Sequence, residues 1–286
     1  MAIDLFSEAT TYAEVLSGAS SFLNKKGRDP QIAEWLIKER FGLSLTDLVR
    51  LHRQVMGEQD KEQFAKDIIE AGKGRPPQHI VGHEWFYDRE FRVTEATLIP
   101  RPETEEWFDR YITTLPKRSL RVLDLGTGSG VLAISHKLER PQDDVTAVDI
   151  STEALTVARQ NAEMLGAEVN FVESDMMKNV SGSFDLILSN PPYISQDEHS
   201  VMDESVMAYE PHLALFAEEN GLHFYKRIAE ESVGKLNPQG CMILEFGYKQ
   251  ASEINDIFRK HYPEAEITIE QDYNSNDRTL HLKNQM

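Results

Sequence analysis

The sequence predicts an α/β protein in which a mostly parallel sheet, covered by helices on both faces, follows a small bundle of helices. Two observations predict this fold class. From residue 120 onward, short aliphatic and β-branched runs alternate with helical segments, which is typical of parallel strands joined by helices. Before residue 75, apolar residues instead recur at helical spacing, as they do through residues 12–23.

The N-terminal 74 residues contain clear helix-start and helix-stop signals. In "DPQIAEWLIKERFG", Asp29 is a predicted N-cap, Pro30 is expected in the first turn and Gly42 is expected to end the helix. Ser44 is a predicted cap for the next helix, with Asp47 at the capping-box position. Another helix is expected within "DKEQFAKDIIEAGKG". Short helices bury their apolar stripes only by packing together, so these segments predict a bundle.

Residues 75–105 are predicted to bridge this bundle, residues 1–74, and the α/β domain, residues 106–286. Pro76 and Pro77 end the helical pattern, and "HIVGHEWFYDREFRV" (residues 79–93) is rich in aromatic and β-branched residues around a turn near Asp88. We therefore expect a linking β-hairpin. Pro102 is expected near the start of the helix that follows.

The elements of the α/β domain follow from the alternation of patterns. The last two strands have no helix between them, so an antiparallel edge hairpin is expected there. The expected helices cover residues 131–139, 152–165 and roughly 221–236. The expected strands are Arg121–Leu125, Val145–Asp149, Val169–Val172, Leu186–Ser189, Cys241–Glu245, Ile267–Gln271 and Thr279–Lys283.

Composition narrows the functional classes. The 286-residue chain has a formal net charge of −18, which disfavours a nucleic-acid partner because phosphate backbones are repelled. The start of the sequence has no basic segment followed by an apolar one, so we expect no secretory signal, and no apolar run approaches membrane-spanning length. The single cysteine, Cys241, excludes an internal disulfide, and the scattered histidines show no metal-binding spacing. We expect a cytoplasmic, monomeric protein without a metal ion.

A glycine-rich segment, "VLDLGTGSGV", joins the first parallel strand to a helix. Gly126, Gly128 and Gly130 allow a tight turn and a close approach of the backbone to a ligand. A dinucleotide-binding fingerprint would require glycine at position 131, where this chain has Val131. The pattern is G-x-G-x-G instead, with Thr127 and Ser129 between the glycines.

Acidic residues surround this glycine loop. Asp124 precedes it, where a carboxylate would repel a pyrophosphate but suit a cation, and Asp149 ends the second strand, where it can meet a ribose diol. The set is similar to the S-adenosylmethionine site of class I (Rossmann-like) methyltransferases. That resemblance implies that Asp175 and Met176, after the third strand, lie beside the adenine. Ordinary core packing explains Met176 equally well.

The fourth strand ends in "SNPPYI". Asn190 precedes a proline and is therefore held extended, whereas Pro191 and Pro192 lack N–H groups. The loop thus offers carbonyl acceptors, the Asn190 side chain adds another, and Tyr193 supplies a flat face. This arrangement is suited to a planar NH₂ group, with two acceptors for its hydrogens and a ring against its π system.

The chain resembles the PrmC/HemK family of protein-(glutamine-N5) methyltransferases over nearly its whole length. The resemblance implies methylation of the glutamine in the Gly-Gly-Gln motif of peptide-chain release factors, with the N-terminal bundle helping to dock the release factor. "NPPY" also resembles the motif of DNA amino-methyltransferases. The segments that carry the resemblance are "LIPRPETE" (98–105), "VLDLGTGSG" (122–130), Asp149, "SNPPYI" (189–194), "YEPHLALFA" (209–217) and "DYNSNDRTL" (272–280).

The glutamine chemistry defines the expected site residues. Asn190 Oδ1 and the Pro191 carbonyl would accept the two amide hydrogens, and Tyr193 would pack against the amide plane. A DNA or RNA amino-methyltransferase would need a basic target-recognition region, which the sequence lacks. A non-catalytic descendant of the fold would be expected to have a damaged glycine loop or NPPY segment, and both are intact.

Overall fold

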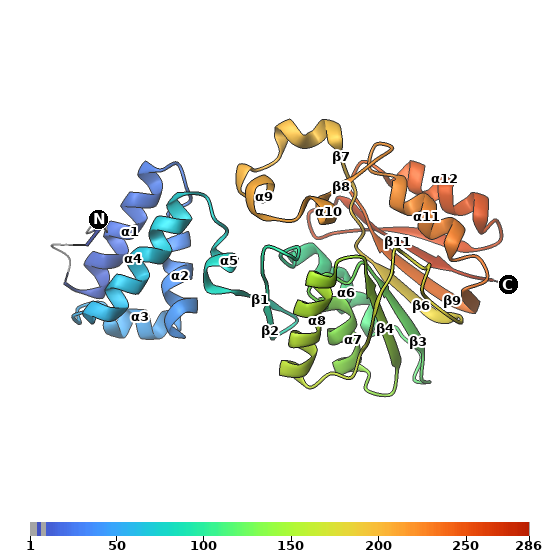
Figure 1. Cartoon of the computed structure of the whole chain (residues 1–286), viewed down its shortest axis with the longest axis horizontal. Helices are drawn as coiled ribbons and strands as arrows, with labels where there is room; N and C mark the ends of the chain where they lie inside the picture. Colours follow the sequence, from blue (N-terminus) through green and yellow to red (C-terminus); the bar gives the residue numbers. More distant parts are fainter. Residues whose placement is uncertain (1–4, 7–9, 286) are drawn as a thin grey trace. The chain divides into compact units, whose positions relative to one another are not determined.

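The computed structural model describes residues 5–6 and 10–285 and divides the chain into two compact units (Figure 1). The first unit comprises the described residues up to His83 together with Asp203–Tyr209, and the second comprises Glu84–Met202 and the described residues from Glu210 onward. The division after His83 falls inside the predicted bridge. The domain boundaries at residues 74 and 105 stay predictions.

The first unit is a bundle of short helices around its own apolar core. Leu23, Leu36, Ile37, Phe64 and Ile68 are fully buried in this core, which agrees with the helical spacing of apolar residues in the sequence. The helices are α1 (Tyr12–Lys25), α2 (Ile32–Phe41), α3 (Leu45–Leu51), α4 (Glu58–Gly72), α5 (Pro77–Val81) and α9 (Glu204–Tyr209).

Most of the capping predictions in this bundle are confirmed. Ser44 and Asp47 form a reciprocal capping box at the start of α3, and Gly42 ends α2 in the left-handed conformation with a φ of 62°. The start of α2 is later than predicted. Asp29 Oδ1 accepts a hydrogen bond from the Gln31 N–H at 2.8 Å, which forms a separate turn, and the helix begins at Ile32.

The predicted hairpin is confirmed for residues 83–92 and wrong for residues 79–81. Strands β1 (His83–Phe86) and β2 (Arg89–Arg92) pair around Tyr87 and Asp88, whose φ values of 50° and 58° suit a two-residue turn. Residues 77–81 form the short helix α5 instead, because Pro77 sits at its first position and Gly82 ends it in the left-handed region.

The second unit is built on a seven-stranded sheet of order β10-β11-β9-β6-β3-β4-β5. Strands β5, β4, β3, β6 and β9 are parallel, and β11 and β10 add the predicted antiparallel edge. The seven predicted strands are confirmed within two residues at each end, except that β9 begins five residues before the predicted Cys241. They are β3 (Arg121–Leu125), β4 (Asp144–Asp149), β5 (Asn170–Glu173), β6 (Phe184–Ser189), β9 (Leu236–Glu245), β10 (Glu266–Gln271) and β11 (Asp277–Lys283).

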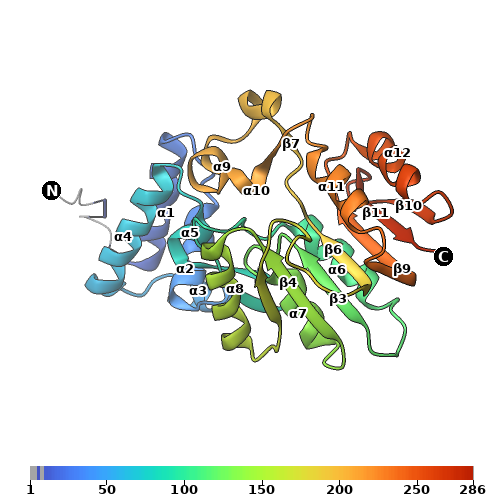
Figure 2. The same ribbon diagram turned by 45° about the vertical axis from the view of Figure 1, so that its right-hand side comes forward.

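Helices cover both faces of this sheet (Figures 1 and 2). On one face, residues of α6, α7 and α8 pack with Val122, Leu186 and Leu188. On the other face, residues of α11 and α12 pack with Leu123 and Ile187. Neighbouring residues of a strand face two different cores, which explains why the central strands are rich in apolar residues on both faces. The helices are α6 (Pro102–Ile112), α7 (Val131–Glu139), α8 (Thr152–Leu165), α11 (His223–Glu231) and α12 (Ala251–His261).

One excursion interrupts the helix–strand alternation after β6. It contains β7 (Ile194–Ser195), the 3₁₀ helix η1 (Gln196–Val201), α9, α10 (His212–Leu215) and β8 (Phe216–Ala217), and β7 pairs in parallel with β8. Within residues 5–6 and 10–285, no helix combines the length and the apolarity that a membrane crossing requires.

Candidate active site

A cavity of about 360 Å³ lies at the carboxyl ends of the parallel strands in the second unit. Ligands of open α/β sheets bind at this edge. Ten of the thirteen predicted site residues line the cavity, and Asp124, Gly130 and Tyr193 do not. The ten are Gly126, Thr127, Gly128, Ser129, Asp149, Asp175, Met176, Asn190, Pro191 and Pro192.

The glycine loop forms one wall of this cavity. Gly126 and Gly128 have φ values of 69° and 56°, and a Cβ built on either would meet no atom within 4 Å. Their α-carbons therefore face open space, and side chains there would fill the cradle. Gly130 has a packing role instead, because a Cβ there would lie 2.7 Å from Ile134 Cδ1 and 3.2 Å from Ala158 Cβ.

Asp149 joins the glycine loop to the start of α8. Its Oδ2 accepts from the Gly128 N–H and its Oδ1 accepts from the Ser151 N–H, both at 2.9 Å. Burial raises the pKa of Asp149 above its ordinary value. Each carboxylate oxygen can accept a further hydrogen bond, so this side chain can meet a pair of ligand hydroxyl groups from a fixed position.

Asp124 lies beneath the glycine loop. Its side chain is 1% exposed, and Oδ2 accepts a hydrogen bond from Thr127 Oγ1 at 2.6 Å. Within the described part of the chain, Oδ1 has no hydrogen-bond partner. Burial raises the pKa of Asp124 to about 7, although the Thr127 hydrogen bond opposes that rise. Asp124 is not among the residues that line the cavity.

Asp175 and Met176 reach the cavity from the loop after β5. Asp175 Oδ1 accepts from Arg227 Nη1 at 2.6 Å, and Lys178 pairs with Oδ2; the hydrogen bond from Arg227 is the main cause of the lowered pKa of Asp175. Met176 has a φ of 52° and packs partly against the apolar core. The aromatic side chain of Phe224, in α11, also lines the cavity.

The NPPY segment forms the opposite wall. Asn190 Nδ2 donates a hydrogen bond to Thr104 Oγ1 at 3.2 Å, so the amide orientation follows from its neighbour. Pro191 and Pro192 line the cavity beside it. Tyr193 instead packs against the apolar core that includes residues of α11 and α12. Burial is the main cause of the raised pKa of Tyr193. Its carbonyl oxygen accepts from Gln250 Nε2 at 3.0 Å.

The residues that sequence reasoning missed come mainly from the segment before α6. Ala96, Thr97, Leu98, Pro100 and Arg101 line the cavity. Buried Glu210 of "YEP" holds this segment, because its carboxylate accepts from the Ile99 N–H at 3.0 Å and from Arg101 Nη2 at 2.6 Å. In the sequence, the signal for this contact is the joint presence of "LIPRPETE" and "YEP".

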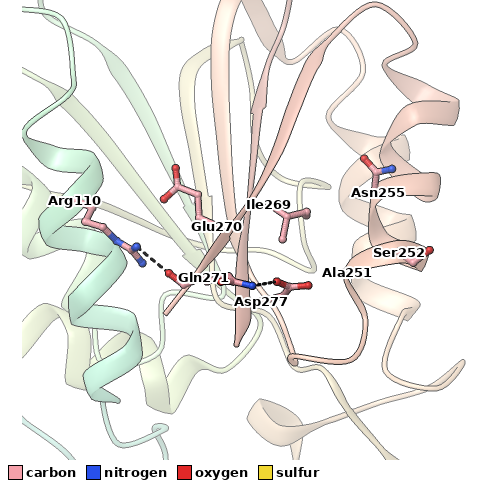
Figure 3. A pocket seen from close by; sticks show the side chains of 8 residues that line it. All are labelled: Arg110, Ala251, Ser252, Asn255, Ile269, Glu270, Gln271 and Asp277. Carbon is pink, nitrogen blue, oxygen red and sulfur yellow. Dashed lines mark hydrogen bonds between the residues drawn. The ribbon is translucent and has the colours of Figure 1, made fainter. Parts of the chain in front are cut away.

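A second hollow opens beside β10 and α12 (Figure 3). Two hydrogen bonds join residues of its lining: Arg110 Nη1 donates to the Gln271 carbonyl at 2.8 Å, and Gln271 Nε2 donates to Asp277 Oδ1 at 3.0 Å. None of the predicted site residues lines it. Among the described residues, no group of three or more His, Cys, Asp or Glu could hold a metal ion.

The cavity fits S-adenosylmethionine. The absence of side chains at Gly126 and Gly128 leaves room for the ligand to lie against the loop. Asp149 can bind a ribose diol, and apolar side chains surround the remaining space. With the seven-stranded sheet, these features define an S-adenosylmethionine-dependent class I methyltransferase.

Comparisons with known proteins identify the family. Residues 110–214 match the family model "Methyltransferase small domain", and residues 14–82 match "PrmC N-terminal domain". The release factor glutamine methyltransferase of Enterococcus faecalis is 42% identical over 271 residues, which cover 94% of this chain and 98% of that protein. The corresponding protein of Bacillus subtilis is 38% identical over 278 residues, which cover 94% and 96%.

A solved structure supports the fold alone. A methyltransferase from Pyrococcus furiosus has a TM-score of 0.54 at 20% identity and covers 70% of this chain and 91% of its own. The identities over nearly the full length carry the assignment: the chain belongs to the release factor glutamine methyltransferase family.

Proposed function

We propose that this protein transfers the methyl group of S-adenosylmethionine to the side-chain amide nitrogen, N5, of the glutamine in the Gly-Gly-Gln motif of a peptide-chain release factor. One observation carries the proposal. Asn190 and Pro191 line the same cavity as the glycine loop and Asp149, so acceptors for an amide NH₂ group lie beside a methyl-donor site.

The glycine loop, Asp149 and the loop after β5 are proposed to hold S-adenosylmethionine, which supplies an electrophilic methyl group when bound. Asp149 would accept hydrogen bonds from the ribose hydroxyls. Asp175 and Met176 would lie beside the adenine. Asp124 does not line the cavity, so it would act on the sulfonium from beneath the loop through its negative charge, which it carries above a pH of about 7.

Asn190 and Pro191 are proposed to bind the substrate amide. A glutamine amide nitrogen is a poor nucleophile because its lone pair is delocalised into the carbonyl. Asn190 Oδ1 and the Pro191 carbonyl would accept the two amide hydrogens and align the nitrogen with the methyl–sulfur axis. These hydrogen bonds strengthen as positive charge develops on the nitrogen, so they favour the transition state over the ground state. The nitrogen can lose its proton after methyl transfer, when it is strongly acidic.

Tyr193 is proposed to act from below the loop. Because its ring packs against the core and its carbonyl is held by Gln250, it would keep Pro191 and Pro192 rigid beside the substrate amide. Alignment by such rigid groups contributes several kcal/mol in general, on the order of the proximity effects measured in intramolecular reactions.

The helical unit is proposed to dock the release factor. The match of residues 14–82 to the PrmC N-terminal domain model supports this role. The formal net charge of −18 supports a protein acceptor over a nucleic acid. We further propose that the protein works as a monomer in the cytoplasm, where release factors are found.

Transfer of labelled methyl from S-adenosylmethionine tests the proposal. The acceptors are intact release factor, the same release factor with its Gly-Gly-Gln glutamine replaced, and unmethylated DNA, each offered separately. We expect label on the intact release factor alone. Label on DNA would assign the chain to the nucleic-acid amino-methyltransferases, and equal label on both release factors would refute the glutamine as acceptor.

A further inference from the structure

We propose that Thr104 and Glu245 form a hydrogen-bond chain that fixes which end of the Asn190 amide faces the substrate. Both would then be positioning residues for methyl transfer. The inference rests on the proposed function and deepens it, because it explains how the acceptor oxygen of Asn190 is presented.

The chain joins three elements of the second unit. Asn190, after β6, donates from Nδ2 to Thr104 Oγ1 at 3.2 Å. Thr104, in the first turn of α6, donates from Oγ1 to Glu245 Oε2 at 2.6 Å. Glu245 ends β9, and its Oε2 also accepts from Trp107 Nε1 at 2.8 Å. The side chains of Thr104, Trp107 and Glu245 are buried, so water has little access to the two hydrogen bonds that Glu245 accepts.

The direction of each hydrogen bond follows from Trp107, which donates to Glu245 at the end of the chain away from Asn190. The indole N–H of Trp107 can only donate, so Glu245 Oε2 must be an acceptor, whether or not the other oxygen carries a proton. The Thr104 hydroxyl has one hydrogen, and the short bond to Oε2 uses it. Toward Asn190, Thr104 therefore offers only a lone pair.

Asn190 must then turn its NH₂ group toward Thr104. Its carbonyl oxygen, Oδ1, is left on the other side of the amide for a donor in the cavity, where Asn190 is part of the lining. The reverse orientation would set Oδ1 against the Thr104 oxygen and would present NH₂ to the substrate NH₂. Two acceptors would face each other at one end and two donors at the other.

The first variant is Thr104→Val, which keeps the β-branched shape and removes the hydroxyl. We expect kcat for methyl transfer to release factor to fall roughly tenfold or more, because the hydrogen bond that orients the Asn190 amide is lost. The KM for S-adenosylmethionine should change by less than about twofold. Thr104→Ser restores the hydroxyl and should recover most of the rate.

A matched control separates positioning from stability. Ser232→Ala also removes a buried hydroxyl, which accepts from Tyr262 at 2.8 Å, and Ser232 does not line the cavity. We expect this variant to lose thermal stability without loss of kcat. If Thr104→Val does not fold by circular dichroism, Thr104→Ala replaces it, because it introduces no new methyl group.

A double-mutant cycle decides whether Thr104 acts through Asn190. In an Asn190→Ala background, Thr104→Val should cause little further loss of kcat. A wild-type kcat in Thr104→Val, or the same fold loss with and without Asn190, would overturn the inference. Failure of the wild-type protein to methylate release factor would instead overturn the proposed function, so the two failures are distinguishable.

Discussion

The buried carboxyl of Asp124 makes stability depend on pH in a way that Asp124→Asn should abolish. Burial raises the pKa of Asp124 from 3.8 to about 7 in the folded protein. Between these two values the folded state holds a proton that the unfolded chain has lost, so folding is less favourable as pH rises. The stabilising contribution is complete below the unfolded pKa and is lost as pH passes through about 7.

The size of this effect follows from the pH range over which unfolding would be measured. The range from about pH 5.5 to the folded pKa of about 7 spans roughly 1.5 pH units. At 1.36 kcal/mol per unit, the wild-type protein loses about 2 kcal/mol of unfolding free energy over this range. Asparagine has nearly the same shape and no charge. We therefore expect the stability of Asp124→Asn relative to the wild type to increase by about 2 kcal/mol between about pH 5.5 and 8.5.

Urea denaturation followed by circular dichroism at several pH values measures this difference. Any constant cost of the substitution cancels, because only the change with pH is compared. Asp185→Asn is the matched control: Arg118 and the Arg121 N–H bind Asp185 and lower its pKa, so it is ionised in both states across the range. A pH-independent difference for Asp124→Asn would show that Asp124 is charged throughout and would refute the reasoning.

Three further substitutions test how the cavity is held. In Gly221→Ala, the added Cβ would lie 2.1 Å from the Tyr193 carbonyl oxygen, and Gly221 has a φ of 83°. The NPPY segment must therefore shift, and we expect kcat to fall by about tenfold or more. In Glu210→Ala, the Ile99 and Arg101 contacts are lost, and calorimetry should show roughly tenfold weaker binding of S-adenosylmethionine. Asp149→Asn weakens the acceptor for Gly128 and should reduce the same affinity by about tenfold or more. A wild-type kcat in Gly221→Ala, or wild-type affinity for S-adenosylmethionine in either of the other two variants, would refute the role given to that contact.

The sheet could be predicted from the sequence because each strand carries its own signal. A parallel strand covered on both faces has a continuous apolar run at its centre, as at Leu186–Leu188 within β6. Helix α5 could not be predicted in this way. Its residues Ile80 and Val81 favour strands locally, but they pack against the core of the helical bundle, and tertiary contacts outweigh such weak propensities.

The site could be predicted where its residues belong to short motifs or follow the ends of predicted strands. The glycine loop and NPPY are local motifs, so their cavity-lining residues were found. The contact between Ile99 and Glu210 spans 111 residues, and no local pattern specifies it. Asp124 and Tyr193 were expected at the ligand because of their places in the motifs, whereas the packing around them turns their side chains into the interior.

The single-turnover rate of Asn190→Ala tests the central claim most directly. Release factor and a saturating concentration of S-adenosylmethionine would be mixed with the variant, and its fold and S-adenosylmethionine affinity would be measured in parallel. If Asn190 Oδ1 binds the reacting amide chiefly in the transition state, the rate should fall by roughly 10²-fold or more with the affinity unchanged. A folded Asn190→Ala protein that methylates release factor at the wild-type rate would contradict the account.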